Sequence, residues 1–349
     1  PNPMVGAVIV RDGHIVGRGF HEKTGEPHAE VHAIRDAGDE ARGATCYVTL
    51  EPCCHQGRTG PCTEALISAG LKRVVYATVD PFPEVSGQGL KKLTDAGIEV
   101  DGPLLEAESK QMNAPFLLAQ KERRPFVTLK LALSLDGMIA DTSGNSSWIT
   151  SEKARTEGHK LRALNQAVLI GAETLRRDNP RLTPRERGII GRPNPIRVVL
   201  TNGQLNLKDK AIMNNIEEHP VWILTTPKGA QSESMEWAKS FGVEVFAIPT
   251  TSEGTIDLPL ALRSLWEKDI VALFCEGGAT LAGNLMREDL VDRLHIFRAP
   301  ITLGGVAGLP GIADLGINGL SEAKKYRRIG LAEHPPDIEE ILEREKPLW

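Results

Sequence analysis

The sequence predicts an α/β protein with two domains, and three observations lead to this prediction. The first is the length, because 349 residues exceed one typical domain. The second is the alternation of short apolar runs with helical segments that end in glycine, a pattern typical of α/β layers. The third is the charged stretch KERRPF (121–126), which contains a proline and interrupts the alternation. We therefore predict domains over 1–122 and 123–349.

The first domain is predicted to begin with a hairpin. MVGAVIV (4–10) has the pattern of a buried strand, RDGH supplies an Asp-Gly turn, and IVGRGF (15–20) returns as the partner strand. The elements that follow alternate in type: a helix over 28–38, a strand over 44–50, a helix over 63–70, a strand over 73–80, a helix over 89–97 before IEV, and a helix over 103–121.

The second domain is predicted to continue the alternation. Apolar runs predict strands over 126–134, 167–171, 196–200, 221–226, 243–248 and 270–276. Helical spacing predicts helices over 151–165, 235–242 and 258–268, the first with Ser151 and Glu152 in its opening turn. HIFRAPITLGG (295–305) is expected to close the series, and the Pro/Arg/Gly-rich segment 181–195 is expected to be a loop.

Composition disfavours several classes of protein. A formal net charge of −5 argues against a general nucleic-acid or anionic-membrane binder. The sequence has no apolar run near the ~18–20 residues that span a bilayer, and no secretory signal pattern. Because a long chain with few cysteines does not need disulfides, we expect a cytoplasmic protein. The chain starts at Pro1 rather than Met, so we expect native residues before it, which leaves a short targeting segment open.

The segment EPCCHQGRTGPC (51–62) concentrates reactive side chains. It holds a histidine and three of the five cysteines of the chain. In a cytoplasmic protein such a cluster indicates metal binding or catalysis, whereas a disulfide between Cys53 and Cys62 is the alternative. The other two cysteines, Cys46 and Cys275, lie in predicted strands and are expected to be core residues.

The motif His28-Ala29-Glu30 would supply a third metal ligand and a carboxyl group that moves protons. Zinc deaminases combine H-x-E with P-C-x-x-C, placing a histidine and two cysteines on the metal and using the glutamate to move protons. Here the ligands would be His28, Cys53 and Cys62, although the second cysteine follows the first by nine positions instead of three. The fourth position would stay open for water, whose pKa zinc lowers towards ~7. Glu30 would carry a proton from that water to the leaving amine.

The predicted helices support this ligand set. His28 opens one predicted helix and Cys62 immediately precedes another, and the positive end of a helix dipole lowers the pKa of a thiol. Two residues of the same loop stay open as alternative ligands. Cys54 is expected to be a small buried residue, and His55 could replace a thiolate.

Three motifs of the second half suggest phosphate and cofactor chemistry. No G-x-G-x-x-G follows a predicted strand, so a Rossmann domain is not supported. EGGAT (276–280) follows an apolar strand and opens a helix, where backbone N–H groups can meet a phosphate, although a tight turn explains it equally well. DNPRLTPR (178–185) places an acid, an amide and two arginines on one loop, which alone would be a solvated loop. SLDG (134–137) alone would be a simple turn.

Taken in order, these motifs resemble the bifunctional riboflavin-biosynthesis deaminase–reductase family. The matching positions of the first half are Asn2-Pro3, His21, Gly25, His28-Ala29-Glu30, 51–62 and Asp80-Pro81. Those of the second half are 130–137, 146–150, 169–174, 178–185, 276–281 and 300–305. The long interval between Cys53 and Cys62 distinguishes this family from cytidine and tRNA-adenosine deaminases. The resemblance covers nearly the whole chain.

The resemblance implies both folds and both reactions. It implies a cytidine-deaminase-like α/β/α sandwich followed by a dihydrofolate-reductase-like α/β domain. It implies Zn²⁺ on His28, Cys53 and Cys62, with Glu30 as the acid/base, for hydrolytic deamination of a diaminopyrimidinone ribosyl phosphate. The second domain would then reduce the ribosyl side chain to ribityl with NADPH. The preference for NADPH over NADH rests on the resemblance alone.

The resemblance also implies binding residues. The deaminase substrate would meet Asn2, His21, His55 and Arg58. NADPH would meet Ala132, Trp148, Thr174, Asp178, Thr201, Gly278, Ala279, Thr280, Leu281, Ala282, Gly283 and Asn284. The substrate of the reductase would meet Lys130, Ser146, Arg162, Leu182, Arg185 and Glu276. Asp178 is in addition assigned to proton supply or substrate orientation.

The chain departs from its relatives at two places near the first site. Arg58 stands where many relatives have Lys, and both are cationic, so we expect the function to be retained. DPFPEVSGQG (80–89) differs at Phe82, Ser86 and Gln88 from the pattern D-P-N-P-x-V-A-G-K/R-G that relatives often show.

Two other functions fit parts of the sequence. A nucleic-acid base deaminase fused to an unrelated α/β domain would favour a basic groove with aromatic platforms, which the acidic balance and 5% aromatic content fit poorly. A closed structural zinc module acting as a scaffold would need four protein ligands. The expected partner is a small phosphorylated pyrimidine, without nucleic acid or membrane. The oligomeric state cannot be read from the sequence, and two sites for sequential steps are compatible with a homo-oligomer.

Overall fold

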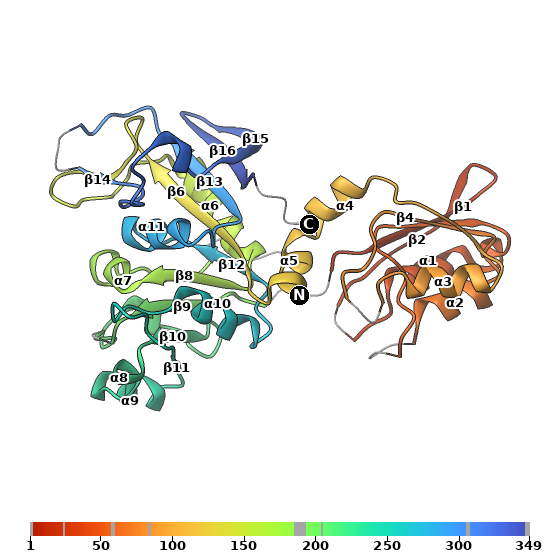
Figure 1. The fold of residues 1–349 in the computed structure, drawn as a ribbon, viewed down its shortest axis with the longest axis horizontal. Helices are drawn as coiled ribbons and strands as arrows, with labels where there is room; N and C mark the ends of the chain where they lie inside the picture. The colour runs from red at the N-terminus through yellow and green to blue at the C-terminus, as the bar shows by residue number, and fades with distance from the viewer. Residues whose placement is uncertain are drawn as a thin grey trace. The chain divides into compact units, whose positions relative to one another are not determined.

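The computed structural model describes residues 3–23, 25–56, 60–82, 85–184, 193–203, 205–304 and 308–345. The chain divides into two compact units, Pro1–Glu122 and Arg123–Leu348. Each unit combines strands with helices, which confirms the α/β class (Figure 1). Among the described residues, no helix combines the length and apolar character that crossing a bilayer requires.

A five-stranded sheet forms the centre of the first unit. Its strands are β1 (Gly6–Arg11), β2 (His14–Phe20), β3 (Thr45–Val48), β4 (Arg73–Tyr76) and β5 (Glu99–Asp101). They lie in the order β2-β1-β3-β4-β5, with β1 antiparallel to β2 and β3 and the last three strands parallel. Asp12 and Gly13, at φ of 51° and 82°, form the predicted turn between β1 and β2.

The helices of the first unit are α1 (Ala29–Ala37), α2 (Cys62–Ser68), α3 (Gln88–Asp95), α4 (Glu106–Met112) and α5 (Ala114–Glu122), with a 3₁₀ turn η1 (Gly38–Ala41). Figure 1 shows α1, α2 and α3 gathered on one face of the sheet. Alternate residues of β1 and β3, such as Ile9 and Cys46, pack against Ala33 of α1 in the core. A Cβ on Gly19 of β2 would lie 2.2 Å from the carbonyl oxygen of Ala29, so glycine lets the start of α1 approach the sheet.

The helical segment predicted over 103–121 is present, but it forms two separate helices, α4 and α5. Asn113 stands between them and uses its side chain on the backbone of Met4. Its Oδ1 accepts from the Met4 N–H at 2.7 Å, and its Nδ2 donates to the Met4 carbonyl at 3.0 Å. The amide therefore ties the helical break to the segment that enters β1.

A nine-stranded sheet forms the centre of the second unit. Its strands are β6 (Phe126–Leu133), β8 (Ala167–Gly171), β9 (Ile196–Thr201), β10 (Val221–Thr225), β11 (Glu244–Ala247), β12 (Ala272–Cys275), β13 (Arg293–Arg298), β15 (Tyr326–His334) and β16 (Asp337–Arg344). The order is β11-β10-β9-β8-β12-β6-β13-β16-β15. The strands from β11 to β13 are parallel, and β16 and β15 are added antiparallel. A small separate pair joins β7 (Met138–Ala140) to β14 (Leu309–Pro310).

Helices cover both faces of this sheet. They are α6 (Glu152–Leu164), α7 (Ala172–Asp178), α8 (Pro227–Ala230), α9 (Glu233–Ser240), α10 (Leu258–Trp266) and α11 (Ala279–Arg287), with 3₁₀ turns η2 (Ala211–Met213) and η3 (Leu320–Glu322). Leu169 of β8 packs with α10 and α11, whereas Val168 and Ile170 pack with α6, α7 and α9. This alternation is the two-sided burial expected of a parallel strand. Ser151 caps α6 by accepting from the Ala154 N–H at 3.4 Å.

The prediction that 295–305 closes the series is wrong. Strand β13 ends at Arg298, and the hairpin of β15 and β16 extends the sheet. These strands carry charges where the pattern of a buried strand requires apolar residues. Glu343 is buried because Arg293 pairs with it at 2.6 Å, and Glu339 is buried because His295 contacts it at 2.6 Å.

Candidate active sites

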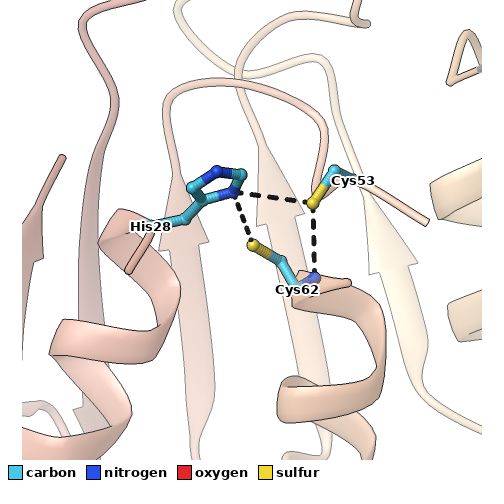
Figure 2. Close-up of side chains that lie close together, drawn as sticks. All are labelled: His28, Cys53 and Cys62. Atoms are coloured by element: carbon cyan, nitrogen blue, oxygen red, sulfur yellow. Dashed lines mark hydrogen bonds between the residues drawn. The ribbon is translucent and has the colours of Figure 1, made fainter. Parts of the chain in front are cut away.

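Two helix starts and one loop bring the predicted metal ligands together (Figure 2). His28 is the N-cap of α1, Cys62 is the first residue of α2, and Cys53 lies on the loop after β3. The Nδ1 atom of His28 lies 3.1 Å from Sγ of Cys62 and 3.5 Å from Sγ of Cys53. All three ligand atoms lie within 4.8 Å of one another. The three predicted ligands, which are far apart in the sequence, therefore lie close together in the fold.

The donor set of this group fits zinc. One imidazole and two cysteine sulfurs are ligands that Zn²⁺ prefers, and three protein ligands leave one tetrahedral position open. None of the five cysteines forms a disulfide, Cys53 and Cys62 included. Within the described residues the group holds only these three side chains, and neither Cys54 nor His55 joins it. Cys46 and Cys275 are fully buried, which confirms that they are core residues.

Hydrogen bonds give the Cys53 sulfur thiolate character. The thiol and the backbone amide of Cys62 donate to it, the amide at 3.3 Å, and the His28 ring contacts it; together they lower the pKa of Cys53 to about 4. The pKa of Cys62 is raised because its thiol keeps the proton it shares with Cys53. The hydrogen bond to Cys53 also raises the pKa of His28. The Cys53 sulfur thus presents negative charge where a cation would bind.

Glu30 lies beside this group in the first turn of α1. Its side chain is buried, and burial raises the pKa of its carboxyl to about 7. A hydrogen bond with Cys62 acts in the opposite direction. A carboxyl of this kind can both accept and release a proton near neutral pH.

A cavity of about 240 Å³ opens in front of the metal ligands. Its walls come from the entrance to β1, the loops after β2, β3 and β4, the start of α1, and helix α5. The lining residues are Pro3, Val5, His21, His28, Glu30, Leu50, Glu51, Cys53, His55, Asp80, Phe82, Val85, Phe116 and Gln120. A larger hollow of about 950 Å³ in the same unit contains none of the predicted site residues.

The structure places two predicted substrate contacts in this cavity. The rings of His21 and His28 meet edge to face with centroids 5.3 Å apart. Nδ1 of His55 is buried and has no hydrogen-bond partner among the described residues, so the ring can receive a ligand atom. The other two predicted contacts, Asn2 and Arg58, lie outside the described residues.

The sequence-based prediction missed the other walls of the cavity. Glu51 directly precedes Pro52-Cys53, and Phe82 follows Asp80-Pro81, so both stood beside motifs that the prediction used. Phe116 and Gln120 come from α5, and no local pattern linked that helix to the metal loop.

In the second unit, three predicted substrate contacts form one group. Arg162 of α6 binds Glu276 through two contacts, one of which joins Nη2 to Oε2 at 2.8 Å. Burial pushes the pKa of Glu276 upward, but the charge and hydrogen bonds of Arg162 outweigh this effect and lower it. Burial lowers the pKa of Lys130, on the neighbouring strand β6, whereas the charge of Glu276 opposes the shift. Arg162 also donates to the carbonyl of Thr183 at 3.3 Å, which joins the group to the loop after α7.

The predicted cofactor residues divide into accessible and buried ones. Gly278 begins α11, and its missing Cβ would lie 3.4 Å from Oγ1 of Thr174, so the two residues adjoin. This open helix start is suited to bind a phosphate through backbone N–H groups. Thr280 is exposed, whereas Ala279, Leu281, Ala282 and Gly283 are buried, and Asn284 is half-buried.

The remaining predicted residues of the second unit differ widely in their exposure to solvent. Trp148 is 68% exposed, with the Arg155 guanidinium 4.3 Å from its ring centroid. The side chain of Leu182 is buried in the core, so only its backbone can face a ligand. Of the others, Ala132 and Ser146 are half-buried, Thr201 is buried at the end of β9, Asp178 ends α7, and Arg185 lies outside the described residues.

Comparisons with known proteins agree with both sites. Residues 1–78 match the cytidine and deoxycytidylate deaminase zinc-binding region, and residues 125–333 match the RibD C-terminal domain. The riboflavin biosynthesis protein RibD of Aquifex aeolicus is 43% identical over 94% of this chain and 88% of its own length. RibD of Escherichia coli is 42% identical over 97% of this chain and 92% of its own length.

Solved structures give the same result. A RibD structure from Acinetobacter baumannii superposes with a TM-score of 0.87 at 36% identity, covering 99% of this chain and 93% of that one. A Thermotoga maritima structure has a TM-score of 0.84 at 36% identity, with coverages of 99% and 93%. The expected pair of folds is confirmed, and the reading as a nucleic-acid base deaminase is not favoured. The chain therefore belongs to the RibD family of bifunctional riboflavin-biosynthesis enzymes, with a zinc-dependent deaminase and an NADPH-dependent reductase.

Proposed function

We propose that the first unit deaminates a diaminopyrimidinone ribosyl phosphate and that the second unit then reduces its ribosyl side chain to ribityl. The Thermotoga maritima relative is described as a diaminohydroxyphosphoribosylaminopyrimidine deaminase and 5-amino-6-(5-phosphoribosylamino)uracil reductase. The observation that carries the proposal is the convergence of His28, Cys53, Cys62 and Glu30 on one cavity.

In the deaminase, His28, Cys53 and Cys62 would hold Zn²⁺, which supplies Lewis-acid activation of the attacking water. Glu30 faces the same cavity, so its carboxylate takes the proton that water loses and passes it to the departing amine. The buried position of Glu30 keeps bulk water from competing for this proton. Ammonia is then the leaving group.

The substrate is proposed to enter the cavity with its ring towards Glu30. His21 and His55 line the wall and would bind polar atoms of the ribosyl phosphate, with Asn2 and Arg58 as further contacts. Nδ1 of His55 has no partner within the described part of the chain, and this supports the orientation, because a hydrogen bond from a ligand to a buried polar nitrogen is favourable. Phe82 and Phe116 supply the apolar walls that a flat heterocycle requires.

In the reductase, Lys130, Arg162 and Glu276 are proposed to bind the substrate, together with Ser146, Leu182 and Arg185. Glu276 holds the Arg162 guanidinium by two contacts, so this arginine presents its remaining N–H groups in a fixed direction. Lys130 adds a half-buried cation next to this pair. The group suits a phosphorylated sugar.

NADPH supplies the hydride of this reaction. The start of α11 at Gly278, with Thr174 beside it, is proposed to hold a phosphate of the cofactor. Ala132, Trp148, Asp178, Thr201 and residues 279–284 are proposed as further cofactor contacts, and Asp178 as the residue that supplies a proton or orients the substrate. Because Leu281, Ala282 and Gly283 are buried, they would act by packing beneath the cofactor.

The decisive experiment incubates the zinc-loaded enzyme with the diaminopyrimidinone ribosyl phosphate and follows ammonia and NADPH separately. We expect ammonia release without NADPH, and NADPH oxidation only after deamination has occurred. Ammonia release from cytidine or from single-stranded nucleic acid, but not from this substrate, would contradict the proposal.

We further propose that the enzyme acts in the cytoplasm as a homo-oligomer, without nucleic acid or membrane partners. The five cysteines form no disulfide, which supports the compartment, because a reducing environment keeps thiols from being oxidised.

A further inference from the structure

The carboxylate of Glu51 collects four backbone N–H groups from one segment of the chain. Oε2 accepts from Gly87 at 2.9 Å and from Asp80 at 3.3 Å. Oε1 accepts from Gly89 at 3.0 Å and from Leu90 at 3.4 Å. The side chain is only 3% exposed, so these bonds replace its hydration.

Glycines make this approach possible. Gly87 has a φ of 77°, a left-handed conformation that suits glycine. A Cβ on Gly89 would lie 2.1 Å from the carbonyl oxygen of Pro52. Helix α3 therefore starts directly on the Glu51 carboxylate, and a negative charge at a helix N-terminus is favourable. The anchor belongs to another loop, so it joins two segments that are distant in sequence.

Both segments form the deaminase cavity. Glu51 immediately precedes Pro52 and the metal ligand Cys53, whereas Asp80, Phe82 and Val85 form another part of the cavity wall. Asp80 Oδ1 accepts from the Phe82 N–H at 2.8 Å, and the Phe82 ring lies 6.1 Å from the His55 ring between centroids. The position of this wall relative to the metal loop thus depends on the four backbone hydrogen bonds that Glu51 accepts.

We propose that Glu51 is a positioning residue of the deaminase, which clamps the wall carrying Asp80 and Phe82 to the loop carrying Cys53. It acts through these backbone groups and transfers no proton. The inference rests on the proposed deaminase function, since the clamped wall is the surface against which the pyrimidine ring would bind.

The substitution Glu51→Gln tests the clamp with almost no change of shape. An amide has one acceptor oxygen, so its NH₂ group must face two of the four N–H donors whichever way it is turned. We expect the KM of deamination to rise by about tenfold or more, as for the loss of a buried charged hydrogen bond, with a smaller change in kcat. Amide hydrogen exchange at Gly87 and Gly89 should accelerate, which a residue acting only on substrate would not cause.

A matched control is Glu64→Gln. This carboxylate also contacts α3, through Lys92 at 3.0 Å, but the pair is exposed. Its KM and exchange rates should stay at the wild-type values. Zinc content and NADPH oxidation by the second unit serve as internal controls and should be unchanged in both variants.

A wild-type KM in Glu51→Gln, or unchanged exchange at Gly87 and Gly89, would overturn the inference. If Glu51→Gln does not fold, Gly89→Ala replaces it, because its Cβ forces α3 away from Pro52 and should give the same rise in KM; a normal KM there would overturn the inference. Wild-type enzyme that releases no ammonia would instead contradict the proposed function itself.

Discussion

A buried ion pair at the start of two neighbouring strands gives a sharp test of the energetics of the second unit. Arg124 precedes β6, and Asp292 precedes β13. Their side chains meet through two hydrogen bonds, Nη1–Oδ2 at 2.7 Å and Nη2–Oδ1 at 2.8 Å. The side chains are 8% and 0% exposed. Asp292 also accepts from the Val127 N–H at 2.8 Å, and Nε of Arg344 lies 3.5 Å away.

The substitution Arg124→Met removes the main partner and keeps most of the volume. Breaking a buried pair from one side costs about 3–5 kcal/mol, because it leaves a buried charge without compensation. Val127 and Arg344 still face Asp292, so we expect the lower end of this range, a loss of about 3 kcal/mol in the free energy of unfolding. Adding Asp292→Asn should recover part of this loss, since the two changes share one interaction.

The loss should depend on pH in a defined direction. Burial raises the pKa of Asp292 despite the hydrogen bonds from Arg124, so the folded state binds this proton more tightly than the unfolded state. Stability linked to Asp292 is therefore present at low pH and is lost as the pH rises through the raised pKa. Arg124→Met removes the group that lowered this pKa. The loss in the free energy of unfolding of this variant should therefore be largest at neutral pH and should shrink as the solution is acidified.

The assay can isolate the second unit. Four of the five tryptophans, Trp148, Trp222, Trp237 and Trp266, belong to the second unit, so with the fifth replaced by Trp349→Phe the fluorescence during urea unfolding reports on this unit alone. Arg263→Met is the control, because Arg263 pairs with Glu267 at the surface and should cost less than about 1 kcal/mol. A loss below about 1 kcal/mol for Arg124→Met, or a deficit that grows in acid, would refute the reasoning.

Two further variants separate the two reactions. Glu30→Gln should reduce ammonia release by at least about a hundredfold while zinc stays bound, because the amide cannot carry the proton; normal deamination would show that another group moves it. Glu276→Gln should lower NADPH oxidation by about tenfold or more, because Arg162 loses its anchor, and should leave ammonia release unchanged; equal damage to both reactions would indicate a general folding defect.

The metal group was predictable from sequence because each ligand stands in a strong local signal. His28 begins a helix, Cys62 begins another, and Cys53 follows a strand, so the end of the sheet had to bring them near each other. The cavity walls were less predictable. Phe116 reaches the site from α5, which is distant in sequence and carries no motif. Glu51 was quoted within the motif, but its role depends on four backbone groups that only the folded chain brings together.

The errors in the fold have a common physical origin, because polar residues took roles that local patterns assign to apolar ones. Asn113 divides a continuous helical pattern by binding the backbone of Met4. In β16, Glu339 and Glu343 are buried through partners on β13, His295 and Arg293, so the strand lacks the apolar alternation by which strands are recognised. At both positions the structure depends on pairing between distant segments, which a local sequence pattern does not contain.

X-ray absorption at the zinc edge of the purified enzyme would identify the atoms around the metal. We expect one zinc per chain, bound by two sulfur atoms and two lighter atoms, of which one is the His28 nitrogen and one comes from solvent. Three or more sulfur neighbours, or a zinc content that survives Cys53→Ser together with Cys62→Ser, would contradict it.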